Sequence, residues 1–185
     1  QKGLALNWQV VDYRHKMAAA NGGPGVVTPC VGYAVAANPM FDFNFIRAHR
    51  AATGIDISQQ LGYVQKYLEF IDWNRLPGNK EFGLADSAHY DYLMPERDIN
   101  YHLREIATIY GSNPDLIRLL GSFTKKQSDE RMPFMPFLQE IPQGTPNAAP
   151  SGRGAVCYEG IGEVIMRSGT GDNDTYAVFV TGATN

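Results

Sequence analysis

The hydrophobic residues between positions 57 and 71 recur with the period of an α-helix. Their spacing alternates between four and three residues, which places them on one helical face. Asp56 precedes the run and Gln59 follows three residues later, a spacing typical of a helix N-terminus. The pattern therefore predicts an amphipathic helix. Its recurring residues are Ile57, Leu61, Val64, Leu68 and Ile71.

Aromatic residues widen the apolar face of this helix. Because Tyr63, Tyr67 and Phe70 extend that face, we expect the helix to be embedded in the protein rather than to lie on its surface. The same three residues are also compatible with the wall of a ligand pocket. The sequence alone leaves core and pocket open as alternatives.

Further helices are predicted on both sides of this segment. Residues 4–20 carry apolar positions at helical spacing and end at a Gly- and Pro-containing stop. Residues 41–52 form a second helix, which Gly54 closes. Residues 98–110 begin with a capping Asp and end before Gly111, and residues 114–121 follow an Asn-Pro pair typical of a helix start. We expect the last two helices to form a short hairpin.

Strand patterns occur at two places. Residues 26–35 are small and β-branched, and Pro29 and Gly32 make this run an edge or bulged strand. Near the C-terminus, residues 155–166 and 175–180 alternate in polarity and flank a polar run. The second region is predicted to be a β-hairpin with an exposed polar tip.

The segment 124–154 differs from the rest of the chain. Prolines recur through it, so it can form neither a long helix nor a central strand. A connection of this length in a small domain is typical of a functional segment or a linking arm. Such an arm either packs across its own domain or contacts a neighbouring subunit. Its candidate contact residues are Met132, Phe134, Met135, Phe137 and Leu138.

These elements predict one α+β domain spanning residues 1–185. Its helical middle, residues 41–121, packs on a small antiparallel sheet formed by residues 26–36 and 155–182. That sheet would bring Cys30 close to Cys157, so we expect a structural disulfide. Closing so long a loop would contribute about 4–5 kcal/mol through loop-closure entropy.

Composition bears on the partners. The chain has 16 Lys and Arg against 19 Asp and Glu, a net charge of −3, which argues against a nucleic-acid partner. No uncharged run is long enough to predict a membrane span. Only 19% of residues are charged, below the typical value of about 25%, and aromatic residues are frequent. Contact with partner subunits is one explanation; an ordinary compact domain with long loops is the other.

Cys30 is a candidate nucleophile. The run Pro29-Cys30-Val31-Gly32-Tyr33-Ala34 resembles the nucleophile region of papain-like cysteine peptidases, which would imply a thiolate activated by a histidine. The resemblance ends there, because the Gln that this family carries upstream is missing and no histidine follows His102. The base would be His49, His89 or His102, with His89 as the first choice.

Two polar clusters are candidates for metal binding. The first is an acidic loop with histidines, and the second is the polar tip at Asp172-Asn173-Asp174, which has the oxygen ligands that calcium prefers. Neither has the spacing of a known metal motif, and a polar loop and a hairpin turn explain them more simply. We therefore expect no metal and no cofactor. The first cluster comprises Asp86, His89, Asp91, Glu96, His102 and Glu105.

The function that these patterns favour is structural. The chain begins at Gln1 without Met, carries an even pair of cysteines and has one glycosylation sequon at Asn173, which together favour a processed, exported protein. We expect a non-enzymatic assembly subunit, such as a component of a surface filament, secretion apparatus or particle, that is secreted, periplasmic or at the cell surface. The alternative is a small secreted hydrolase that uses Cys30 with a histidine, or the acidic loop.

Overall fold

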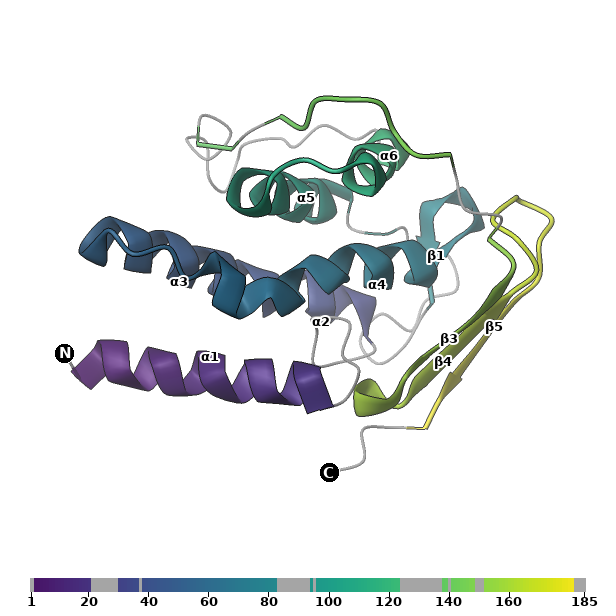
Figure 1. Ribbon diagram of the computed structural model, residues 1–185. Coiled ribbons are helices and arrows are strands. Elements are labelled where there is room, and N and C mark those ends of the chain that lie inside the picture. The colour runs from purple at the N-terminus through teal and green to yellow at the C-terminus, as the bar shows by residue number, and fades with distance from the viewer. Residues whose placement is uncertain are drawn as a thin grey trace.

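The computed structural model describes residues 2–20, 30–36, 38–82, 94, 96–123, 138–139, 141–148 and 152–181. They form an α+β fold, as the sequence predicts. Figure 1 shows the helices in three tiers: α1 in the first, α2, α3 and α4 in the second, and α5 and α6 in the third. A small sheet of β3, β4 and β5 stands beside one end of the tiers.

Helix α1 (Lys2–Ala20) confirms the predicted N-terminal helix. A narrow strip of side chains attaches it to the second tier. Val11 is buried, and the Trp8 ring meets the Phe45 ring edge-on at 5.3 Å between centroids. Trp8 also meets the ring of His49. Most other described side chains of α1 are exposed, so the helix lies on the body rather than inside it.

The second tier contains α2 (Val31–Ala36), α3 (Asn38–Thr53), the 3₁₀ helix η1 (Ser58–Lys66) and α4 (Tyr67–Asn74). The apolar pattern of residues 57–71 is confirmed as a buried face, but the predicted continuous helix is not. Leu61 has a non-helical backbone at φ −109° and ψ 26°, which separates the turns on either side. Asp56 stabilises the start of η1, because its Oδ1 accepts a hydrogen bond from the Ser58 N–H at 2.8 Å.

The third tier is the predicted helical hairpin, formed by α5 (Glu96–Tyr110) and α6 (Pro114–Ser122). Gly111 ends α5 with a left-handed φ of 86°, a conformation that favours glycine. Asn113 caps α6, since its Oδ1 accepts a hydrogen bond from the Leu116 N–H at 2.9 Å. Local sequence signals therefore set both helix ends.

The C-terminal region forms a three-stranded antiparallel sheet rather than a hairpin. Its strands are β3 (Gly154–Tyr158), β4 (Glu163–Arg167) and β5 (Tyr176–Val180), in that spatial order. The predicted first run contains a tight turn, η5 (Glu159–Ile161), followed by Gly162 at φ 62°. A second, smaller sheet pairs β1 (Arg75–Leu76) with β2 (Lys80–Glu81) around η2 (Pro77–Asn79).

The prediction of a strand over residues 26–36 is wrong for its described part. Residues 31–36 form α2, and residues 21–29 lie outside the described residues. Val31, Ala34 and Val35 are all buried, and their spacing matches one face of a helix. Burial against neighbouring helices thus overrides the β preference of Val31 and Val35. The C-terminal sheet therefore forms without the 31–36 segment.

Arg167 joins the C-terminal sheet to the helices. Its side chain reaches inward from β4 and is 2% exposed. Nε donates to the Gly152 carbonyl at 2.7 Å, and one terminal nitrogen, Nη1, donates to the Asp72 carbonyl at 2.9 Å. The guanidinium carbon lies 3.9 Å from the centre of the Trp73 ring, a cation–π contact. No helix among the described residues has the length and apolar character needed to cross a membrane.

We expect Arg167→Met to lower the free energy of unfolding by about 3 kcal/mol, because it leaves the buried Asp72 and Gly152 carbonyls without their donor. Urea unfolding followed by circular dichroism measures the change. The control is Arg153→Met at an exposed arginine, which should change stability by less than about 0.5 kcal/mol. Equal effects of the two variants would contradict the assigned role.

Candidate functional site

The predicted disulfide between Cys30 and Cys157 is not formed in the structure. Cys30 is buried just before α2, and Cys157 is exposed on β3. The expectation relied on a sheet that includes both cysteines, and the segment after Cys30 is helical instead. The two free cysteines therefore add no loop-closure stabilisation and do not support an exported protein.

The different exposure of the two thiols predicts their reactivity. In the native protein, a thiol reagent such as dithionitrobenzoate should label Cys157 fast and Cys30 only as the protein opens, because Cys30 is 2% exposed. Cys157→Ser should remove the fast phase and leave the slow one. If the protein purified without reductant shows no reactive thiol until it is reduced, the two cysteines are bonded after all.

The structure places two of the three histidine candidates, His49 and His102. His89, with Asp86 and Asp91, lies outside the described residues. His102 is fully buried in α5 with its Nδ1 3.1 Å from the Tyr67 hydroxyl oxygen, and burial lowers its pKa to about 3. His49 packs beside Trp8, with its Nδ1 3.2 Å from the Ile55 carbonyl oxygen. A role for Cys30 as a nucleophile with His89 stays a prediction.

Glu105, one of the acidic residues of the candidate metal cluster, has other partners. Glu105 is fully buried and accepts two hydrogen bonds from the Arg47 guanidinium, at 2.7 and 3.1 Å. Gln139 donates a third to the same carboxylate at 2.7 Å. In the described part of the chain, no group of three His, Cys, Asp or Glu side chains is arranged to hold a metal ion. Glu105 instead ties α5 to α3.

The polar tip between β4 and β5 is a hydrogen-bonded turn. One carboxylate oxygen of Asp174 accepts from the Ser168 hydroxyl at 2.9 Å, and the other from the Gly171 N–H at 2.7 Å. The Ser168 hydroxyl oxygen in turn accepts from the Thr175 N–H at 2.9 Å. Because its carboxylate is used within the turn, Asp174 supports the interpretation as a hairpin turn.

The predicted interaction arm falls largely outside the described residues. Met132, Phe134, Met135 and Phe137 lie outside the described residues, whereas Leu138 is 55% exposed. Gln139, beside it, is buried and donates to Glu105. The arm is therefore anchored at residue 139, and its role as a contact surface stays a prediction.

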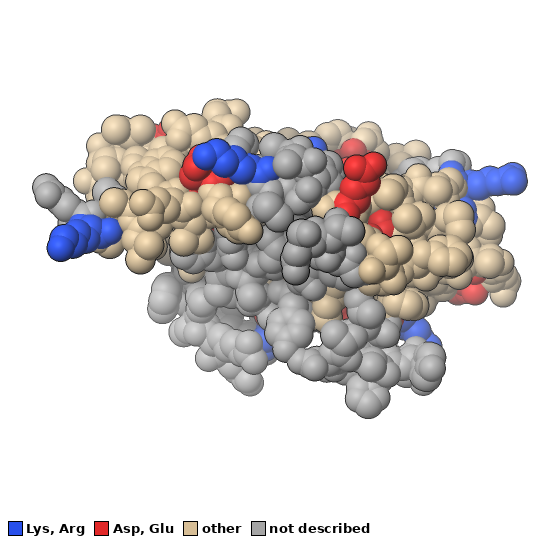
Figure 2. Space-filling view, turned by 90° about the horizontal axis from the view of Figure 1, so that it is seen from below, with Lys and Arg blue, Asp and Glu red and all other residues tan. Residues whose placement is uncertain are grey.

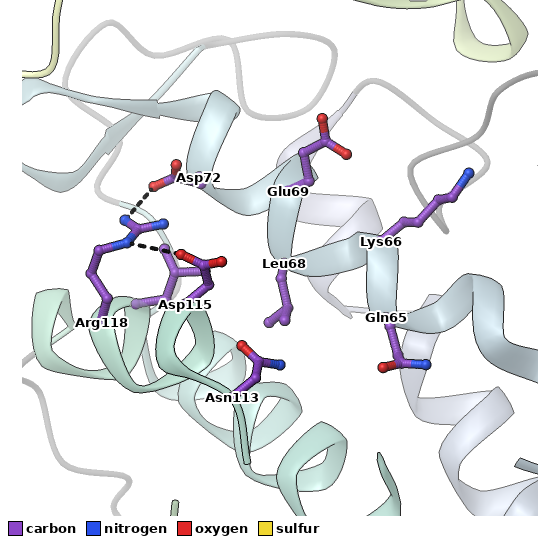
Figure 3. A pocket seen from close by; sticks show the side chains of 9 residues that line it. Gln65, Lys66, Leu68, Glu69, Asp72, Asn113, Asp115 and Arg118 are labelled. Carbon is purple, nitrogen blue, oxygen red and sulfur yellow. Dashed lines mark hydrogen bonds and ion pairs between the residues drawn. The ribbon is translucent and has the colours of Figure 1, made fainter. Parts of the chain in front are cut away.

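A cavity of about 530 Å³ lies between α4 and α6. In Figure 3, Arg118 reaches from α6 towards Asp72 on α4, and Asp115 lies alongside it. Arg118 Nη1 is 3.1 Å from an Asp72 oxygen, and its Nε is 3.6 Å from an Asp115 oxygen. The lining residues are Gln65, Lys66, Leu68, Glu69, Asp72, Asn113, Asp115, Arg118 and Leu119, and they include no cysteine, serine, threonine or histidine.

Asp72, which lines this cavity, is the centre of a cluster with three arginines. Arg118 at 3.1 Å and Arg75 and Arg167, each at 3.6 Å, surround its carboxylate. Burial lowers the pKa of Arg75, and Asp72 partly offsets this effect. Arg75 also lines a second cavity of about 400 Å³ beside the polar tip. Since the three guanidiniums share the Asp72 carboxylate, the cluster holds α4, α6 and β4 together.

The surface of the sheet that faces away from the helices is apolar. Glu163, Ile165 and Arg167 of β4 are buried, so strand alternation directs Val164 and Met166 outward. The register places two residues of β3 and two of β5 beside them. We call this surface the outer face. It comprises Ala155, Cys157, Val164, Met166, Ala177 and Phe179, none of which is buried.

A second apolar surface lies on α1. Leu6 is 60% exposed, Val10 38% and Tyr13 63%, and their spacing places them on one side of the helix. We call these three residues the α1 stripe. Figure 2 views the molecule from the side on which α1 lies; charged side chains are scattered there, and the described residues form no patch of a single sign.

Sequence reasoning missed the outer face, although a signal was present. Residues 163–167 read Glu-Val-Ile-Met-Arg, so the two charged residues and Ile165 share one side of a strand. This alternation distinguishes the two faces of the strand, but it favours solvent exposure for the face with Glu163 and Arg167. The structure reverses this assignment, because Asp72 and Asn74 supply buried partners for Arg167 and Glu163.

Glu163 is a buried acid under the sheet. It is 1% exposed, its Oε2 accepts from the Asn74 side-chain amide at 3.4 Å, and its Oε1 has no hydrogen-bond partner among the described residues. Burial raises the pKa of Glu163 to about 7, and the Asn74 hydrogen bond lowers it by a smaller amount. The folded protein therefore holds this proton more tightly than the unfolded chain does.

This raised pKa predicts a pH dependence of stability. A folded-state pKa of about 7 against 4.5 for the free side chain stabilises the protein below pH 4.5, and this contribution is lost as the pH rises to 7. Glu163→Gln should thus gain about 3 kcal/mol over the wild type between pH 4.5 and 8, measured by urea unfolding. Glu159→Gln, at an exposed acid, is the control. A pH-independent difference for Glu163→Gln would contradict the assignment.

Comparison with known proteins gives no relative. No protein-family model matches the chain, and neither a curated protein nor a solved structure matches it.

Proposed function

We propose that this protein is a non-enzymatic subunit of an assembly and that its outer face lies against a neighbouring copy of the chain. The single observation that carries the proposal is the composition of that face: all six positions are apolar or cysteine. An antiparallel sheet with one side in water usually carries polar residues on that side. A continuous apolar surface is typical of a protein–protein contact.

The choice of a second copy as the neighbour rests on charge. When two identical faces meet about a two-fold axis, each residue lies near residues of its own kind, so like charges would repel. The outer face has no charged residue, and its exposed side chains Met166 and Phe179 belong to types enriched in interface cores. The face is therefore compatible with itself.

The α1 stripe supports assembly beyond a dimer. The stripe lies on α1, whose N-terminus is far from the sheet in Figure 1, and the outer face lies on the sheet of β3, β4 and β5, so the two are surfaces of different elements. Two separate apolar surfaces give one subunit two neighbours, as in a filament, secretion apparatus or particle. The proposal does not depend on export to the cell surface or periplasm, for which the free cysteines are no longer an argument.

A lysine on the outer face tests the proposal. Met166 lies on the central strand, 40% exposed, and Met166→Lys places a charge against a like charge in any contact between two such faces. We expect the wild type to grow in mass with concentration in light scattering and sedimentation velocity. The variant should need at least about tenfold higher concentration to associate, a cost of about 1.4 kcal/mol.

The matched control is Ala51→Lys, which adds the same charge at an exposed position of α3. It should associate like the wild type. Thermal unfolding checks that both variants stay folded. A wild type that remains a single chain up to millimolar concentration would overturn the proposal, as would equal association of Met166→Lys and the wild type.

A further inference from the structure

The strand β5 leaves one side of its backbone without a strand partner among the described residues. The order of the sheet is β3-β4-β5, so β5 is an edge strand. Its five residues, Tyr176–Val180, include no charged residue and no proline. Edge strands of folded proteins usually carry such residues, which prevent pairing with another chain. The edge of β5 has neither of these protections.

The direction of the backbone groups along β5 follows from its bonds to β4. The Thr175 carbonyl accepts from the Ser168 N–H, and the Thr181 N–H donates to the Gly162 carbonyl, so both residues face β4. Backbone groups alternate in an antiparallel ladder, which directs those of Ala177 and Phe179 to β4 as well. The N–H and C=O groups of Tyr176, Val178 and Val180 therefore point to the side of β5 that has no strand partner among the described residues, which we call the open edge.

We propose that this edge pairs with β5 of a second copy of the chain, antiparallel about a two-fold axis at Val178, to form one six-stranded sheet. The inference deepens the proposed function and rests on it, since it names the first contact of the assembly. In this register Tyr176 lies opposite the second copy's Val180, and Val178 lies opposite itself. In each of these pairs the two residues both direct their backbone N–H and C=O groups to the edge. The N–H of each residue can therefore donate to the C=O of the other.

Two features favour this register: the number of β5 residues that pair, and the side chains that lie opposite each other. Pairing about Val178 aligns all five residues of β5 with all five of the second copy. A shift of the axis by one residue leaves part of each strand unpaired. On the outer face, Ala177 then lies opposite the second copy's Phe179. This pair sets a small side chain beside a large one, and neither side chain is charged.

The opposite edge, on β3, is the weaker candidate. Glu163, Ile165 and Arg167 of β4 direct their backbone groups to β3, because the residues between them bond to β5. On β3 the residues opposite these three face β4, which leaves only Ala155 and Cys157 directed outward. The strand is also bounded by Gly154 and by the turn η5.

Pairing of β5 makes the outer face continuous across two copies. The two apolar surfaces become neighbours on the same side of the six-stranded sheet and double the area that a further contact covers. One five-residue strand pair buries less than the roughly 1,200 Å² of standard stable interfaces. We therefore expect a reversible dimer that forms as concentration rises.

Hydrogen exchange at single amides tests the pairing. In the monomer, the Val178 and Val180 N–H groups should exchange fast, whereas those of Ala177 and Phe179 are protected by β4. At a concentration where sedimentation shows dimers, Val178 and Val180 should slow at least tenfold, and Ala177 and Phe179 should stay protected. Equal exchange of Val178 in monomer and dimer would overturn the inference.

Val178→Pro is the corresponding variant. Proline removes the edge-directed N–H and leaves the bonds to β4 in place, a position where edge strands tolerate proline. The matched control, Val178→Ala, keeps the N–H. We expect Val178→Pro to raise the dimer dissociation constant at least tenfold relative to Val178→Ala, with β4–β5 amide protection retained in both variants. An unchanged constant in a folded Val178→Pro protein would overturn the inference.

The two proposals fail separately. Association that Met166→Lys weakens and Val178→Pro leaves unchanged supports the outer face as the contact and rejects pairing of β5. Association that Val178→Pro weakens and Met166→Lys leaves unchanged supports edge pairing and rejects the outer face. A wild type that stays monomeric rejects both.

Discussion

Several polar contacts between the C-terminal sheet and the helices converge on one buried guanidinium, that of Arg167. A small sheet of three five-residue strands needs a hydrophobic face to bury or a helix to pack against, so it depends on the layer beneath it. Apolar side chains such as Ile165 join the core, and Arg167 adds a polar connection through the Gly152 and Asp72 carbonyls, the Asp72 carboxylate and the Trp73 ring. Burying a charge is costly unless it is paired, and these partners provide the pairing. The position of Arg167 thereby fixes which side of β4 faces the helices.

That choice of side determines the surface of the protein. A strand slipped by one residue would turn Arg167 and Glu163 to solvent and bury Val164 and Met166. Asp72 would then keep Arg75 and Arg118, but Asn74 would lose its bond to Glu163. The observed register keeps the polar contacts inside and places the apolar side chains outside. The exposed apolar face is therefore a consequence of buried polar pairing, and its cost is offset where the face is covered by another molecule.

Local signals in the sequence predicted several helix ends and the C-terminal strand segments, but they missed the helix at residues 31–36 and the side of the sheet that faces inward. Caps such as Asn113 and a terminator such as Gly111 act within a few residues, so the sequence shows where those helices begin and end. Val31 and Val35 belong to a helix that only burial against other elements explains. The side of β4 that faces inward depends on Asp72 and Asn74, which are distant in the chain. Partners at such separations leave no local pattern.

The same register links the outer face to the open edge. In an antiparallel sheet, side-chain facing and backbone direction both alternate with period two, so one choice of register sets both. With Arg167 inward, its pairing partner Tyr176 also faces inward, and its backbone groups point away from β4. The Tyr176 hydroxyl donates to the Trp73 carbonyl, which holds this end of β5 against the helices. The open edge is thus presented by a strand that the body fixes in place, so pairing with a second copy requires little ordering of β5.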